Sequence, residues 1–191
     1  MTAAPGSAAL LIVDVVNDFA FEDAGDLLGF MDDVAGVIDG LRGQAAALGL
    51  PVIYINDNYG HWHSDVSGIV DRCLGQEGPG SEIVARLLPR PDDYFVIKPQ
   101  FSGFYATTLP VLLPKLGVNR VVLTGIAADI CILFTAADAH MRDYDLWVPR
   151  DGVASSSAAH RDWALGIMDK SMDADTRPTT ELALADWVAR A

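Results

Sequence analysis

Three side chains that are suited to covalent or proton-transfer chemistry each come after an apolar run of the sequence. Asp14 directly follows LLIV, Lys98 directly follows YFVI, and Cys131 comes shortly after VVLTG. A cysteine can act as a nucleophile, a carboxylate can take and return its proton, and an ammonium stabilises negative charge. Read singly, they also fit a turn aspartate, a solvated strand-terminal lysine and a small buried thiol. Only their convergence would make them a catalytic group.

The elements that must position these residues alternate between strand-like and helix-like patterns. Apolar, β-branched runs predict strands over residues 8–16, 52–55, 94–97, 120–124 and 146–148. Helical spacing of apolar residues predicts helices over 30–48, 81–88, 107–116, 128–141 and 181–190. This alternation predicts an α/β protein, a three-layer α-β-α Rossmann-like fold whose mainly parallel central sheet is flanked by helices.

Parallel strands bring their carboxyl ends to one edge of the sheet, where ligands usually bind. Asp14, Lys98 and the segment leading to Cys131 all follow predicted strands, and so do Asn56 and Asp57. Cys131 also falls in the first turn of a predicted helix. The helix N-terminus and a nearby lysine are expected to lower the pKa of the thiol and to favour an oxyanion.

Composition excludes several classes of protein. The 191 residues are 51% hydrophobic, with 13 basic and 26 acidic side chains and a formal net charge of -13. These values predict one folded domain over residues 1–191, with no basic face for nucleic acid and no membrane span. The N-terminus has no basic leader, which predicts a cytoplasmic protein. The irregular segment 56–80 is a candidate lid over a small-molecule pocket, and Cys73 reads as a buried hydrophobe.

Three motifs together resemble the isochorismatase-like cysteine hydrolases, which include nicotinamidases, N-carbamoylsarcosine amidases and ureidoacrylate hydrolases. They are LLIVDVVNDF, VIKPQFSGFYATTL and VLTGIAADICILFTAADAHMRDYDLWVPRDGVAS, in the family's order and spanning the chain to about residue 175. The resemblance implies that Asp14, Lys98 and Cys131 form the catalytic triad. It also implies a cis peptide between Ile126 and Ala127, and an oxyanion hole made by the backbone N–H groups of Ala127 and Cys131.

The sequence departs from the family pattern at two places. Val16 stands where many members have a glutamine, so a polar contact from that side chain is missing. Nicotinamidases carry an Asp-x-His metal motif, whereas this chain has NDNYGHWHSDV, in which Asp57 and His61 are four residues apart. That spacing fits neither the motif nor a standard zinc site, so these two residues are weak metal candidates. We expect neither a metal nor another cofactor.

Several aromatic residues are candidates for the substrate pocket. By the resemblance, Phe19 matches the aromatic that packs over the substrate, and His61 and Trp62 are expected to line the pocket. Phe104 fits a pocket wall and the hydrophobic core about equally well.

The resulting hypothesis is a cysteine-dependent amidohydrolase that cleaves the C–N bond of a small amide, ureido, carbamoyl or lactam substrate through a thioester. The alternatives are an isochorismatase-type enol-ether hydrolase and a catalytically silent binding protein. The resemblance favours amide chemistry, because members that hydrolyse enol ethers generally lack the nucleophilic cysteine. Dimers or tetramers are expected, as is common in the family. A dinucleotide-binding domain is disfavoured, since no glycine-rich loop follows the first strand.

Overall fold

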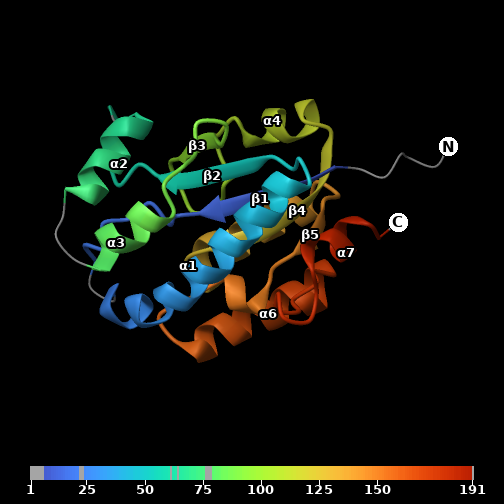
Figure 1. The fold of residues 1–191 in the computed structure, drawn as a ribbon. Coiled ribbons are helices and arrows are strands. Elements are labelled where there is room, and N and C mark those ends of the chain that lie inside the picture. The colour runs from blue at the N-terminus through green and yellow to red at the C-terminus, as the bar shows by residue number, and fades with distance from the viewer. Residues whose placement is uncertain (1–6, 22–23, 61, 64, 76–78, 191) are drawn as a thin grey trace.

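The computed structural model describes residues 7–21, 24–60, 62–63, 65–75 and 79–190. In this part of the chain, parallel strands form one sheet in the order β3-β2-β1-β4-β5 (Figure 1). The strands are β1 (Ser7–Val13), β2 (Val52–Asp57), β3 (Tyr94–Lys98), β4 (Val118–Gly125) and β5 (Asp145–Trp147). The predicted parallel sheet is therefore confirmed.

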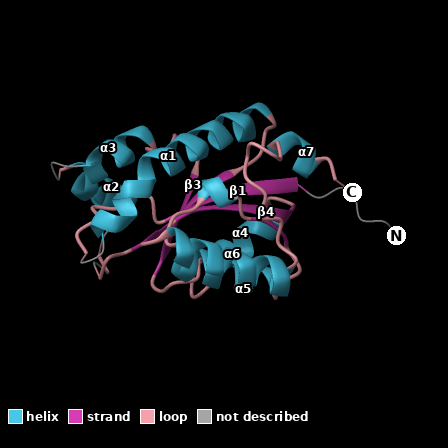
Figure 2. Ribbon diagram, turned by 90° about the horizontal axis from the view of Figure 1, so that it is seen from below, coloured by secondary structure: helices cyan, strands magenta, loops and turns pink. Residues whose placement is uncertain are grey.

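Helices cover both faces of the sheet (Figure 2). One layer holds α1 (Ala24–Ala47), α2 (Val66–Leu74), α3 (Pro79–Arg86) and α7 (Leu184–Val188). The other holds α4 (Leu109–Lys115), α5 (Leu133–His140) and α6 (Ala158–Met172), with the short turns η1 (Ala128–Ile132) and η2 (Arg150–Gly152) in the loops after β4 and β5. This is the expected three-layer α/β architecture.

The apolar strand sequences follow from burial on both faces. In β1, Leu10 and Ile12 belong to the core under α1, whereas Ala9, Leu11 and Val13 belong to the core on the opposite face. A strand that packs against helices on both sides has no solvent-facing positions, so it reads as a continuous apolar run rather than an alternating one.

The strand order reverses at β1, and this places the functional edge. β2 and β3 lie on one side of β1, and β4 and β5 lie on the other. The chain therefore leaves the carboxyl ends of β1 and β4 in opposite directions, and such a topological switch point is where open α/β sheets usually bind ligands. Asp14 follows β1 at this point, and the segment after Gly125 follows β4.

Two helices were missed by the sequence patterns, and the final helix is shorter than expected. The expected lid at 56–80 contains α2, which begins at the capping residue Asp65 and buries Ile69 and Cys73. The missed α6 begins after Ser157, whose hydroxyl accepts from the His160 N–H, and its mixed composition hides its apolar face. The final helix is limited to α7. Among the described helices, none is long and apolar enough to cross a membrane.

Candidate active site

Asp14, Lys98 and Cys131 meet at the carboxyl edge of the sheet. The Lys98 ammonium lies 2.8 Å from the Asp14 carboxylate and donates to the Cys131 sulfur at 3.4 Å. The thiol and the Asp14 carboxylate are close enough that each shifts the pKa of the other. Lys98 is fully buried, Asp14 is 6% exposed and Cys131 is partly buried. The structure thus brings together the three residues that were singled out from the sequence.

Asp14 is held by the end of the neighbouring strand. Its backbone lies in the left-handed region with a φ of 54°, which ends β1 after Val13 rather than at the predicted Val16. The Asp14 N–H donates to the Ile55 carbonyl at 2.9 Å, and the Asp57 N–H donates to the Asp14 carboxylate at 2.8 Å. Asp14 therefore has a fixed position between β1 and β2.

Asn56 and Tyr59 secure the loop that follows Asp14. The fully buried Asn56 side chain accepts from the Val16 N–H and donates to the Val16 carbonyl, and the Tyr59 hydroxyl donates to the same carbonyl. Sequence patterns placed Asn56 at the functional edge but gave it no role. A polar amide directly after an apolar strand was the available signal. The main chain of Val16 is thus fixed without a polar side chain at that position.

The loop after Lys98 is tied to the helix that follows Cys131. The Gly103 N–H donates to the Thr135 hydroxyl at 2.9 Å, and the Ser102 hydroxyl donates to Asp138 at 2.5 Å. Thr135 is fully buried. These two bonds fix the lysine and the cysteine segments relative to each other.

The cysteine segment leaves β4 through a tight backbone turn. A side chain at Gly125 would place its Cβ 2.0 Å from the Val13 carbonyl oxygen, so only glycine fits here, at a φ of 110°. The peptide bond between Ile126 and Ala127 is cis. The Ala127 carbonyl then accepts from two N–H groups of the π-helical turn η1, which contains Cys131.

Burial controls the electrostatics of the cluster. Burial raises the pKa of Cys131 to about 12, and the Asp14 carboxylate adds to this rise more than Lys98 offsets it. The expected lowering of the thiol pKa is therefore wrong. Burial also raises the pKa of Asp14 against the opposing effect of Lys98. Burial would lower the pKa of Lys98, but the surrounding acidic groups, led by Asp14, raise it overall. The resting site holds a neutral thiol and a charged lysine.

The weak metal site is not supported by the donors that the structure describes. Asp57 lies 3.5 Å from the Lys98 ammonium and accepts from the Tyr59 N–H at 2.7 Å. A cation at Asp57 would be repelled by this lysine. His61 is outside the described residues, and within the described ones no three His, Cys, Asp or Glu side chains are placed to hold a metal ion.

The aromatic candidates lie in different environments. Phe19 is buried, with its ring close to Gly80 and 6.2 Å from Phe21, whereas Trp62 is 73% exposed. Phe104 is buried against Tyr144, which favours the core over the pocket wall.

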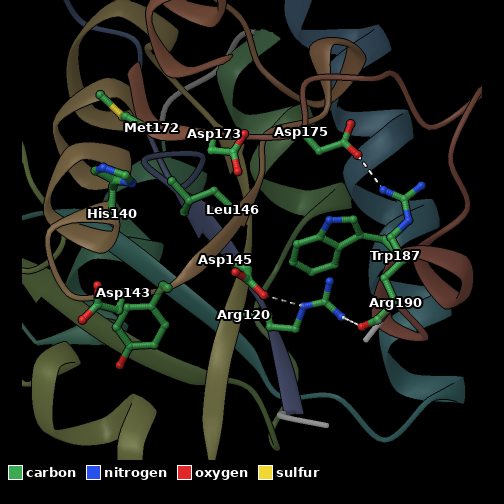
Figure 3. A pocket seen from close by; sticks show the side chains of 11 residues that line it. Arg120, His140, Asp143, Asp145, Leu146, Met172, Asp173, Asp175, Trp187 and Arg190 are labelled. Carbon is green, nitrogen blue, oxygen red and sulfur yellow. Dashed lines mark hydrogen bonds and ion pairs between the residues drawn. The ribbon is translucent and has the colours of Figure 1, made fainter. Parts of the chain in front are cut away.

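A cavity of about 520 Å³ lies at the opposite end of the sheet, beside the first residues of β4 and β5 (Figure 3). Its charged groups are largely paired with one another. Arg120 lies 3.3 Å from Asp145, and Arg190 lies 2.9 Å from Asp175. The Arg120 guanidinium also packs over Trp187 and donates to two backbone carbonyls of the C-terminal segment. These contacts anchor α7 to the sheet.

Comparisons with known proteins agree with this geometry. The isochorismatase domain model matches residues 8–179. The uncharacterized isochorismatase family protein YaaI of Bacillus subtilis is 40% identical over 91% of this chain and 93% of its own length. Ureidoacrylate amidohydrolase RutB of Pantoea ananatis is 27% identical over 82% of this chain and 70% of its own length.

A solved structure shows the same fold. The N-carbamoylsarcosine amidase of Thermoplasma acidophilum superimposes with a TM-score of 0.69 and 29% identity, covering 93% of this chain and 99% of its own. Domain match, sequence identity and fold agree over nearly the whole length, and the chain therefore belongs to the isochorismatase family.

Proposed function

We propose that this protein is a cysteine-dependent amidohydrolase that cleaves an amide-type C–N bond of a small molecule through a thioester on Cys131. The observation that carries the proposal is the contact of one buried ammonium, Lys98, with both the Cys131 sulfur and the Asp14 carboxylate. A nucleophile, a base and a cation in mutual contact suit acyl transfer. The names of the ureidoacrylate and N-carbamoylsarcosine relatives describe hydrolysis of this kind of bond.

The proposed reaction begins from a protonated thiol. Because burial raises the pKa of Cys131 to about 12, the thiol keeps its proton until a substrate is attacked. The raised pKa of Asp14 makes its carboxylate a stronger base for that proton. As the proton moves to Asp14, the sulfur bonds to the substrate carbonyl carbon and the carbonyl electron pair moves to oxygen. We assign the backbone N–H groups of Ala127 and Cys131 to that oxyanion.

The tetrahedral intermediate then collapses to a thioester. The C–N bond breaks, and the leaving nitrogen takes the proton held by Asp14. A water molecule next attacks the thioester while Asp14 accepts its proton; the acid product leaves and the thiol regains the proton. Lys98 keeps its own protons throughout and stabilises the sulfur whenever it carries negative charge.

The pocket is proposed to take a small, largely neutral amide. Primary amides, ureido and carbamoyl compounds and lactams all present a suitable carbonyl group. Phe19 and Trp62 are the described candidates for contacts with such a substrate, together with His61 outside the described residues. Assembly as a dimer or tetramer and a cytoplasmic location stay predictions.

A substrate panel tests the proposal. It contains primary amides, ureido acids, carbamoyl compounds, lactams and one enol ether, and it is read by ammonia release and by product mass. The mass readout is needed because ring opening of a lactam releases no ammonia. We expect hydrolysis of at least one C–N substrate and a loss of at least about 10³-fold in Cys131→Ala.

The matched control is Cys73→Ala, which removes the chain's other thiol from the buried face of α2. It should keep its turnover. A Cys131→Ala variant that hydrolyses amides near the wild-type rate would rule out the thioester. Hydrolysis of the enol ether alone would support the isochorismatase-type reaction instead, and no turnover by the wild-type protein would favour a silent binding protein.

A further inference from the structure

A second carboxylate contacts the buried lysine. Asp57 pairs with Lys98 in the parallel register of β2 and β3, and its carboxylate lies 3.5 Å from the Lys98 ammonium. The side chain of Asp57 is 32% exposed, compared with 9% for Asp14 and none for Lys98. Asp57 thus contacts the lysine from the more open side of the cluster.

Three acceptors surround the three N–H groups of the ammonium. They are the carboxylates of Asp14 at 2.8 Å and Asp57 at 3.5 Å, and the sulfur of Cys131 at 3.4 Å. With the thiol neutral, two carboxylates face one ammonium, so the cluster carries one net negative charge. Lys98 therefore has one counter-ion more than a simple ion pair would require.

The surplus becomes useful when Asp14 changes its charge. In the proposed reaction the thiol proton moves to Asp14 while the sulfur bonds to the substrate carbon, so neither Asp14 nor Cys131 then offers a negative charge to the lysine. An ammonium that is fully buried favours loss of its proton unless an anion remains beside it. Asp57 takes no part in that proton transfer, so its carboxylate remains beside the ammonium, 3.5 Å away.

We propose that Asp57 is a positioning residue that holds Lys98 charged and in place while Asp14 and Cys131 exchange a proton. This inference rests on the proposed function, because it needs Asp14 to act as the base. Only one proton moves, from the Cys131 sulfur to an Asp14 oxygen, and the lysine keeps all three of its own.

The contacts of Asp57 itself suit a fixed counter-ion. One carboxylate oxygen accepts from the Tyr59 N–H at 2.7 Å while the other faces Lys98. Its own N–H donates to Asp14, so one residue orients both members of the ion pair. Among the described residues, Tyr59 is a further titratable group close by. Burial holds its pKa well above the usual value, so it stays neutral across the pH range of an assay.

The test removes this charge by Asp57→Asn in the full chain, on a Cys73→Ala background that leaves one thiol. The first readout is the rate of Cys131 alkylation by iodoacetamide in the free protein, which needs no substrate. With Asp57 neutral, Lys98 stabilises the thiolate more strongly, so the thiol pKa should fall by about one unit. Tenfold more thiolate, offset by its weaker nucleophilicity, gives about threefold faster alkylation.

The second readout is the pH dependence of turnover. The loss of one nearby negative charge also lowers the pKa of Asp14, so the acid limb of kcat should move down by about one pH unit while KM stays within about twofold. Asp57→Glu should restore the wild-type behaviour. The control is Asp92→Asn, the same charge change on an exposed residue before β3.

Each outcome decides the question. Unchanged alkylation and an unchanged acid limb in Asp57→Asn would overturn the inference, and a rise in KM alone would make Asp57 a substrate contact instead. If the asparagine variant does not fold, Asp57→Ser removes the same charge with a smaller side chain. If the wild-type protein hydrolyses no amide, the alkylation readout still tests Asp57 separately from the proposed function.

Discussion

Replacement of Lys98 by methionine should make stability strongly dependent on pH. Methionine has a similar length and fills the same space without the charge, so the main effect is electrostatic. Lys98 is fully buried and lies 2.8 Å from Asp14, whose own side chain is 9% exposed. Removing one partner of a buried pair leaves an uncompensated charge, at a cost of about 3–5 kcal/mol.

The sign of the pH dependence follows from the proton that Asp14 can bind. Without the lysine, the pKa of folded Asp14 rises further above its usual 3.8, whereas in the unfolded chain it stays near that value. Between the two values the folded state holds more protons, so the free energy of unfolding falls as the pH rises. A cost of 3–5 kcal/mol corresponds to about two to four pKa units, so the loss should be small near pH 4 and nearly complete near pH 8.

Urea unfolding at pH 5 and pH 8, followed by tryptophan fluorescence, measures this difference. The exposed lysine of α4 supplies the control, since Lys115→Met should change stability by less than about 0.5 kcal/mol at either pH. Adding Asp14→Asn to Lys98→Met should recover most of the loss at pH 8. An equal loss at both pH values, or no recovery in the double variant, would refute the electrostatic account.

Three further outcomes follow from the site. First, kcat/KM should decline on acidification through a pH above 3.8. Asp14 must be ionised to accept the thiol proton, and burial raises its pKa against the opposing effect of Lys98. An acid limb of the kcat/KM profile at or below pH 3.8 would contradict this. Second, mass mapping after iodoacetamide treatment at pH 7.5 should find neither cysteine modified quickly. Burial raises the pKa of Cys131 to about 12 and that of Cys73 to about 11. Rapid labelling of Cys131 would instead show that its thiol is ionised in the resting protein. Third, Gly125→Ala should lower the free energy of unfolding by at least about 3 kcal/mol in urea titrations. Gly43→Ala, at a position in α1 with open space around it, should be neutral or stabilising. Equal effects of the two substitutions would be inconsistent with the close approach of Gly125 to Val13.

The positions of the strands along the chain could be predicted from the local sequence pattern. A buried parallel strand must be apolar at nearly every position. A run such as LLIV therefore predicts a strand without any information about the elements that pack against it. Helix α6 was not predicted, because its 15 residues bury only a few apolar side chains and so show little helical periodicity of apolar residues. Helix α2 was not predicted either, because it buries few apolar side chains and lies in a segment rich in turn residues.

The three candidate reactive side chains were also identifiable from the sequence, because each lies at or beyond the end of a predicted strand and their motifs resemble those of the isochorismatase-like hydrolases. The supporting residues were not. Asn56 and Asp57 follow the second strand, but only the register of β2 beside β1 and β3 shows which atoms they reach. A strand-end position predicts proximity to a site and does not specify the partner.

The sequence by itself determined the fold class and singled out Asp14, Lys98 and Cys131 as candidate catalytic residues, through the strand pattern and the family resemblance. Tertiary structure alone decided the protonation of the cluster. A helix N-terminus beside a lysine predicted a thiol of low pKa, yet burial and the Asp14 carboxylate raise it. Desolvation and charge balance depend on every group that packs around Cys131, and those groups come from β1, β2 and β3, far apart in the chain.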